Sequence, residues 1–129
     1  MPMDEFLSDR RVLVVEDEIM VLMVIESALA DMGCRSVSVA SSVADTLGLI
    51  ETKRFDVAIL DVNLGATPSF AIADALARQD VPFMFSTGYS KLGIDARFGD
   101  RPVLQKPYSD KALGAALISL LNVEAAVSA

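Results

Sequence analysis

Short apolar runs recur along the chain at fairly regular intervals, and most of them are rich in β-branched residues. They cover residues 12–15, 37–40, 57–60, 81–85 and 103–104. The stretches between them have the apolar spacing of helices, so strands and helices are expected to alternate. Runs this apolar fit strands that are buried on both faces, as in parallel sheets covered by helices on both sides. The pattern predicts an α/β fold with a doubly wound parallel sheet of five strands and five helices.

Three of the expected helix starts carry residue types that cap or begin helices: Ser42 with Asp45, Thr67 with Pro68, and Ser109. The fourth helix is expected over about residues 90–98. It contains Gly93 and a weak apolar pattern, so it should be short and easily displaced.

The first helix has apolar residues on two faces. At about 100° per residue, one face is expected to pack on the sheet and contains Val21, Val24, Ile25, Ala28 and Met32. The opposite face contains Ile19, Leu22, Met23 and Glu26. Three apolar residues are more than a solvated face usually carries, so this face is either a docking surface or is covered by a neighbouring loop.

A chain of 129 residues fits a single domain over residues 1–129, with a core at about 10–121 and frayed tails. Although 53% of the residues are hydrophobic, no apolar run approaches the ~20 residues of a membrane span. The first residues lack a basic segment and a long apolar stretch, so we expect a cytoplasmic protein without a membrane anchor. Cys34, the single cysteine, is expected to be a small buried thiol.

The charge balance and the absence of histidine exclude several classes of function. Eleven basic and eighteen acidic residues give a net charge of −7, which repels nucleic acid unless a basic patch exists, and no such patch is evident. The chain has no histidine. Histidine-based catalysis, histidine metal ligands and a phosphohistidine on this chain are therefore excluded.

Three carboxylates directly follow two of the most apolar runs. Glu16 and Asp17 come after residues 12–15, and Asp61 comes after residues 57–60. If these runs are neighbouring parallel strands, their carboxyl ends open into one crevice, where α/β sheets place their chemistry. Oxygen ligands of this kind suit a hard divalent cation such as Mg²⁺ or Mn²⁺.

A hydroxyl and a lysine follow the last two expected strands. Thr87 lies after the fourth strand and Lys106 after the fifth, so both are expected in the same crevice. A cation, a lysine and a hydroxyl around a carboxylate make a cradle for a phosphoryl group, whose transfer depends on positioning and on charge neutralisation. A carboxylate nucleophile would become an aspartyl phosphate.

In kind and order, these residues resemble the signature of response-regulator receiver domains, the CheY-like domains of bacterial two-component systems. The matching segments are Glu16-Asp17, Asp61-Val62-Asn63, Thr87-Gly88 and Lys106-Pro107. The resemblance covers nearly the whole chain and implies a flavodoxin-like (βα)5 sheet with strand order 2-1-3-4-5.

The resemblance also implies a role for each site residue. Asp61 is the expected phosphoacceptor, with Thr87 and Lys106 binding the phosphoryl oxygens. Mg²⁺ or Mn²⁺ is expected on Asp17, Asp61 and the Asn63 carbonyl, with Glu16 acting mainly through water. The bond between Lys106 and Pro107 is expected to be cis. In this family the positions of Asn63 and Tyr89 line the path of the hydrolytic water, and Tyr89 should prolong the life of the phosphoform.

Two features point to a subgroup of receivers. Val103 stands where many receivers carry Phe or Tyr, so the switch is expected to run through backbone order instead. The run from Phe85 to Tyr89 resembles the Phe-x-Thr-Gly-Tyr signature of a subgroup that is often stand-alone. Members of that subgroup tend to work with histidine kinases of the HWE or a related class.

The expected partners are a histidine kinase or phosphotransfer protein and an unknown downstream protein. A helical hairpin bearing the donor histidine would dock on Ile19, Leu22, Met23 and Glu26 together with Pro107 and Tyr108. The domain would assist its own phosphorylation and dephosphorylation without being an enzyme in the usual sense. It would either deliver a signal or act as a phosphate sink.

Three alternatives compete with this interpretation. A phosphatase of the haloacid dehalogenase type needs a second acid two residues after the nucleophile, where this chain has Asn63. A flavin carrier needs a turn rich in Ser, Thr and Gly, whereas Glu16-Asp17-Glu18 would repel phosphate. A receiver-shaped interaction module that works without phosphorylation remains open.

Overall fold

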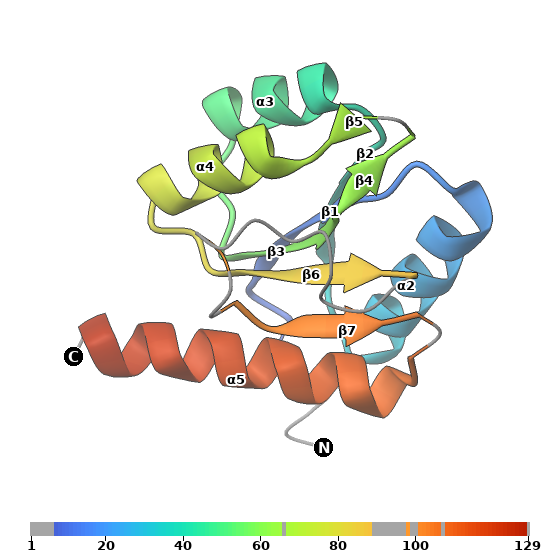
Figure 1. Cartoon of the computed structure of the whole chain (residues 1–129). Coiled ribbons are helices and arrows are strands. Elements are labelled where there is room, and N and C mark those ends of the chain that lie inside the picture. The colour runs from blue at the N-terminus through green and yellow to red at the C-terminus, as the bar shows by residue number, and fades with distance from the viewer. Residues whose placement is uncertain (1–6, 66, 89–97, 99–100, 107, 129) are drawn as a thin grey trace.

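The structure, a computed structural model, describes residues 7–65, 67–88, 98, 101–106 and 108–128 (Figure 1), with the backbone alone for 122–128. Its main sheet has five parallel strands in the order β2-β1-β3-β6-β7. The strands are β1 (Arg11–Val15), β2 (Ser36–Ala40), β3 (Val57–Asp61), β6 (Phe83–Thr87) and β7 (Val103–Gln105). Strands β4 and β5 form a separate hairpin, so the predicted order 2-1-3-4-5 is confirmed.

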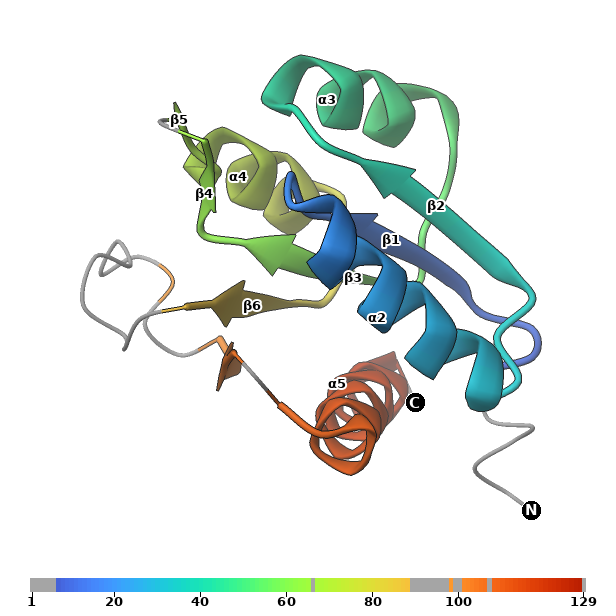
Figure 2. The same ribbon diagram turned by 90° about the vertical axis from the view of Figure 1, so that its right-hand side faces the viewer.

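Helices cover both faces of the sheet, as Figure 2 shows. The helices of the described part of the chain are α2 (Ile19–Asp31), α3 (Val43–Thr52), α4 (Phe70–Arg78) and α5 (Asp110–Ser128). One core lies between the sheet and α2 with α5, and it includes Ile25, Leu29, Leu113 and Leu117. The other lies under α3 and α4, and it includes Ile50, Ile72 and Leu76.

The central strands are apolar over most of their length because they contribute to both cores. Val12 and Val14 of β1 lie in the α2/α5 core, whereas Leu13 and Val15 lie in the α3/α4 core. All four are at most 1% exposed. Successive side chains of a strand point to opposite faces, so burial on both sides removes the polar alternation of a half-exposed strand.

Two of the three predicted helix starts are confirmed. The Ser42 hydroxyl accepts a hydrogen bond from the Asp45 N–H at the start of α3, and the Ser109 hydroxyl accepts one from the Ala112 N–H at the start of α5.

The third helix start, at Thr67 and Pro68, was wrong. These two residues form β5, which pairs with β4 (Asn63–Leu64) in an antiparallel hairpin, and α4 begins two residues later at Phe70. Gly65 has a φ of 64°, which suits the hairpin turn, and Leu64 is buried in the α3/α4 core. Tertiary packing of Leu64 therefore keeps this segment extended.

The predicted fourth helix lies almost wholly outside the described residues. Of residues 90–98 the structure describes Phe98, which is buried and packs against the rings of Phe70, Phe83 and Phe85. Cys34 is buried as expected, and burial raises the pKa of its thiol. Among the described helices, none is long and apolar enough to cross a membrane.

Candidate functional site

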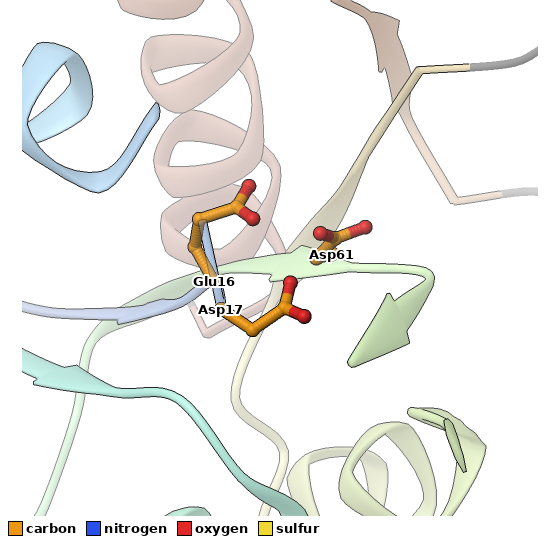
Figure 3. A group of neighbouring side chains, drawn as sticks. All are labelled: Glu16, Asp17 and Asp61. Atoms are coloured by element: carbon orange, nitrogen blue, oxygen red, sulfur yellow. The ribbon is translucent and has the colours of Figure 1, made fainter. Parts of the chain in front are cut away.

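Three carboxylates meet at the carboxyl ends of β1 and β3, where the sequence predicted them. Glu16 and Asp17 follow β1, and Asp61 is the last residue of β3. One oxygen from each of the three lies within 4.8 Å of the others, and Figure 3 shows the three groups around one space. Glu16 and Asp61 are buried, at 1% and 7% exposure, whereas Asp17 is exposed. Neighbouring parallel strands thus bring together residues that are 45 positions apart, such as Glu16 and Asp61.

Strand register places a row of polar residues on the α2/α5 side of the sheet. Val15 pairs with Leu60, so Glu16 stands level with Asp61, and Asp61 pairs with Ser86 of β6. The residue before each of these three lies in the α3/α4 core, so alternation turns all three toward α2 and α5. At the carboxyl edge of the sheet, the side chains that face α2 and α5 are therefore polar, whereas further along the strands they are apolar.

Lys106 joins the two buried carboxylates of this row. Its Nζ lies 2.6 Å from Glu16 Oε1 and 3.3 Å from Asp61 Oδ2. Its backbone N–H donates to the Thr87 carbonyl at 2.6 Å, which holds the end of β7 against the end of β6. Thr87 itself is 5% exposed. The five residues expected to converge are therefore gathered at one edge of the sheet.

Tyr108 covers the other end of the polar row. Its hydroxyl lies 3.0 Å from the Ser86 hydroxyl, within hydrogen-bond distance, and its ring packs against the α2/α5 core. Burial raises the pKa of Tyr108, so it stays a neutral phenol. Ser86 was not singled out from the sequence, although a polar residue directly after the apolar run at residues 81–85 and directly before Thr87 is a signal that could have identified it.

The electrostatics of the crevice favour a proton or a cation on Asp61. Burial first, and then the neighbouring Glu16 carboxyl, raise the pKa of Asp61 to about 6, while Lys106 and the Asn63 N–H act in the opposite direction. Burial alone would lower the pKa of Lys106, but Glu16 and Asp61 outweigh it and the pKa is raised. Lys106 therefore stays positively charged, and the neighbouring Asp61 carboxyl holds its proton more tightly than usual.

The remaining expected site residues are only partly described. The Asn63 N–H donates to Asp61 Oδ1 at 3.3 Å, and Asn63 is otherwise exposed. Tyr89 and Pro107 lie outside the described residues, as does the bond expected to be cis. Val103 is half-buried and packs against the α3/α4 core.

An exposed apolar surface lies on α2 beside the crevice. Ile19, Met20, Met23 and Val24 are 70%, 75%, 58% and 61% exposed. A cavity of about 230 Å³ adjoins this surface and is lined by Met20, Val21, Val24, Ile25, Lys106 and Tyr108.

The helical projection assigned two of these α2 residues incorrectly. Val24 was expected against the sheet but is exposed, and Leu22 was expected outside but is half-buried against the α2/α5 core. Val24 instead lines the cavity beside Lys106 and Tyr108. Met20 was missed altogether.

Comparison with known proteins gives the family. The model of the response regulator receiver domain matches residues 12–118, and the chain therefore belongs to the response-regulator receiver family. Domains of this family are signalling modules that interact with histidine kinases or phosphotransfer proteins. A comparison with curated proteins gave no match.

Several solved structures are similar to the chain over most of its length. The solution structure of SdrG from Sphingomonas melonis Fr1 is 42% identical, with 87% of this chain and 96% of that chain covered and a TM-score of 0.78. The BeF3-activated conformation of SdrG from Pseudomonas melonis Fr1 is 44% identical, with 86% and 95% covered and a TM-score of 0.75.

A more distant structure shares the fold. The receiver domain of the sensor histidine kinase PA1611 from Pseudomonas aeruginosa PAO1, with a magnesium ion in its active site cleft, is 22% identical. The match covers 88% of this chain and 98% of that chain, with a TM-score of 0.76.

Proposed function

We propose that this receiver domain accepts a phosphoryl group on Asp61 from a histidine kinase or phosphotransfer protein, in a Mg²⁺-dependent reaction in the cytoplasm. The observation that carries the proposal is the position of Asp61. Its carboxylate ends a buried central strand, shares a space with two further acids, and lies 3.3 Å from the Lys106 ammonium. No other aspartate of the described residues combines these surroundings.

The donor set fits a hard divalent cation. Carboxylate oxygens of Glu16, Asp17 and Asp61 lie within 4.8 Å of one another, and such oxygens are the ligands that Mg²⁺ and Mn²⁺ prefer. Asp17, Asp61 and the Asn63 carbonyl would hold the cation, with Glu16 acting mainly through water. The magnesium ion described for the PA1611 receiver supports this assignment. When bound, the cation supplies positive charge to the phosphoryl oxygens and favours the ionised form of Asp61.

The chain's own residues then perform the transfer. An Asp61 oxygen attacks the phosphorus of a phosphohistidine or of a small acyl phosphate, the new P–O bond forms, and the bond to the donor breaks. Lys106 neutralises charge on the transferred oxygens, and the Thr87 hydroxyl binds one of them. From the family resemblance, Asn63 and Tyr89 are the residues proposed to control the water that later hydrolyses the phosphoform, and the bulk of Tyr89 is expected to slow that step.

The switch follows from the neighbours of Thr87. Its carbonyl holds the Lys106 N–H, so movement of Thr87 toward a phosphoryl oxygen would pull on the end of β7. Val103 pairs with Phe85 in the β6–β7 ladder and has no ring that could turn. We infer that the segment between β6 and β7 reorders through its backbone. The BeF3-activated conformation of a relative 44% identical supports a phosphorylation-dependent change of state.

A phosphohistidine donor would dock on the apolar surface of α2 beside the crevice. The proposed docking residues are still Ile19, Met23, Glu26, Pro107 and Tyr108. We add Met20 and Val24, because they are exposed and line the adjoining cavity. Leu22 is half-buried against the α2/α5 core, so it would contribute mainly by supporting the exposed residues of this surface. Helices with an apolar stripe bind surfaces of this kind. An HWE-class kinase is the proposed donor, and the domain acts as a stand-alone carrier of signal or as a sink for phosphate.

Val24→Asp is expected to slow phosphotransfer from a phosphorylated histidine kinase about tenfold, as for loss of an apolar hot-spot contact. Labelling by acetyl phosphate should be unchanged, because this small donor needs no docking surface. Glu26→Lys should act in the same direction. The donor is chosen from a panel of phosphorylated kinases as one that labels the wild type. Val39→Asp is the matched control, since Val39 is an exposed valine on β2, 41% exposed. Equal losses with both donors would contradict the docking surface.

The proposed function itself is tested by incubating the protein with acetyl phosphate, with and without Mg²⁺, followed by Phos-tag electrophoresis. A slower band that requires Mg²⁺ and disappears with hydroxylamine is expected, because acyl phosphates are cleaved by that nucleophile. Absence of the band with acetyl phosphate and with every kinase of the panel would contradict the proposal. That outcome would favour the interaction module that works without phosphorylation.

A further inference from the structure

Ser69 is a buried polar residue next to the crevice that has no role in the mechanism above. It is fully buried, at 0% exposure. Its Oγ lies 2.5 Å from the carbonyl oxygen of Asp61 and 3.0 Å from that of Val62, and its N–H donates to the Val62 carbonyl at 2.9 Å. A hydroxyl carries one proton, so the two carbonyls share one donor. Ser69 therefore contacts the peptide of the phosphoacceptor itself.

These contacts close a short loop that contains two of the proposed site residues. The loop leaves β3 at Asp61, passes through the hairpin of β4 and β5, and returns at Ser69. Asn63 lies in the first strand of the hairpin, paired with Pro68. At the turn, a Cβ on Gly65 would stand 3.8 Å from Asp17 Oδ2, so the hairpin tip borders the acids. The position of Ser69 at the base of the loop thus determines where Asn63 stands relative to Asp61 and Asp17.

The Ser69 hydroxyl differs from those of Ser42 and Ser109 because it does not cap the helix that it precedes. Ser42 and Ser109 cap α3 and α5 with their hydroxyls. Ser69 precedes α4 but makes no side-chain cap bond, although such a bond typically stabilises the start of a helix. The hydroxyl instead binds the carbonyls of Asp61 and Val62, and complete burial means that water cannot replace it there.

We propose that Ser69 is a positioning residue for the metal and phosphoryl site: its hydroxyl holds the peptide carbonyls of Asp61 and Val62 so that the Asp61 carboxylate and the Asn63 carbonyl face the same cation. This inference rests on the function proposed above. Loss of the hydroxyl leaves two buried carbonyls without this donor, and the loop is then free to shift. Residues that orient metal ligands from outside typically change metal affinity or activity by about 10- to 100-fold when replaced.

The experiment compares Ser69→Ala with Ser42→Ala, which removes the hydroxyl that accepts the Asp45 N–H at the start of α3. Both variants should lower the midpoint of unfolding in urea titrations by a similar amount. Only Ser69→Ala should weaken Mg²⁺ binding, by about tenfold in calorimetry, and slow acetyl phosphate labelling at saturating Mg²⁺, also by about tenfold. Ser69→Thr keeps the hydroxyl and should recover much of both properties. Measurements are made at a temperature at which all variants are folded by circular dichroism.

Each result decides between positioning and a structural role. If Ser69→Ala and Ser42→Ala keep wild-type Mg²⁺ affinity and labelling rate, or lose both to the same extent, the positioning role is overturned. If Ser69→Ala cannot be obtained folded, Ser69→Thr and Ser69→Cys replace it, and Cys, a weak donor, should weaken Mg²⁺ binding relative to Thr. A wild type that binds Mg²⁺ but gains no phosphate defeats the proposed function, whereas the role of Ser69 is still decided by the Mg²⁺ affinities. A wild type that binds no Mg²⁺ overturns both.

Discussion

Asp61→Asn is expected to abolish labelling by acetyl phosphate and by any kinase, with no residual band in Phos-tag electrophoresis. An amide is uncharged and its lone pairs are delocalised, so it is far less nucleophilic than a carboxylate. Asp31→Asn is the matched control, because Asp31 is exposed at the end of α2, and it should be labelled like the wild type. Labelling of Asp61→Asn at the wild-type rate would mean that another residue accepts the phosphate.

The same variant should change how the stability of the metal-free protein depends on pH. In the folded wild type the pKa of Asp61 is raised to about 6, from an ordinary value of 3.8. Between these two values the folded state binds more protons than the unfolded state, so this group's contribution to stability is complete below pH 3.8, falls as the pH rises, and is lost above about 6.

Urea titrations across this range test the pH effect. The wild type should lose stability on going from about pH 4 to about pH 6.5 relative to Asp61→Asn, which lacks the titrating group. Saturating Mg²⁺ should reduce the difference, because a cation on the crevice favours the ionised carboxylate. Parallel pH dependences of the two proteins without Mg²⁺ would contradict the electrostatic account of the crevice.

The fold was predictable from the sequence because its signals are local and strong. The runs of β1 and β3 are buried on both faces, and unbroken apolar β-branched segments are the pattern that such burial requires. Convergence of Glu16, Asp17 and Asp61 followed from the same step, since neighbouring parallel strands end at one edge of the sheet. Prediction of the site therefore required knowing which strands are neighbours. The periodicity of the apolar runs and the family resemblance together gave that information.

The hairpin and the role of Ser69 were not predictable in the same way. Thr67 followed by Pro68 is a good helix start in isolation, but burial of Leu64 and the turn at Gly65 draw the segment into β4 and β5. Ser69 then occupies the helix start without capping it. Contacts between a loop and its own base are tertiary, so no spacing rule could reveal that the Ser69 hydroxyl binds the Asp61 carbonyl.

The aromatic residues near Val103 show a related limit of sequence patterns. The family resemblance placed Val103 where many receivers carry Phe or Tyr. In the structure, Val103 packs against a core that already contains the rings of Phe70, Phe83, Phe85 and Phe98, and Arg101 lies 4.4 Å from the Phe83 ring centre. The four rings come from α4, β6 and the segment before β7, so only the fold brings them together. We infer that the packing of these four rings, more than a rotating side chain at 103, accompanies the proposed switch.

Lys106→Met is expected to have two separate consequences, loss of phosphorylation and loss of stability. Lys106 neutralises the Glu16 and Asp61 carboxylates, and its side chain is only 14% exposed while that of Glu16 is 1% exposed. Removal of one partner of a buried pair leaves an uncompensated charge and costs about 3 kcal/mol. The labelling rate should fall by about a hundredfold or more, since a preorganised charge on the transferred oxygens is worth that much. Methionine keeps the apolar stem that borders the α2 cavity.

The double variant Glu16→Gln/Lys106→Met separates these two consequences. Glutamine keeps an oxygen that can accept the Glu18 N–H, which Glu16 Oε2 now accepts at 3.1 Å, but it removes the unpaired charge. Stability in urea titrations without Mg²⁺ should therefore return most of the way to the wild-type value, while acetyl phosphate labelling stays lost. Recovery of labelling would mean that Lys106 serves only to neutralise Glu16. Unchanged stability of the single variant would mean that the 2.6 Å ion pair with Glu16 contributes nothing to the fold. Stability depends on the ion pair between Lys106 and Glu16, whereas labelling depends on the proposed contact between Lys106 and the phosphoryl oxygens. The two variants therefore show whether the same lysine charge is needed for both.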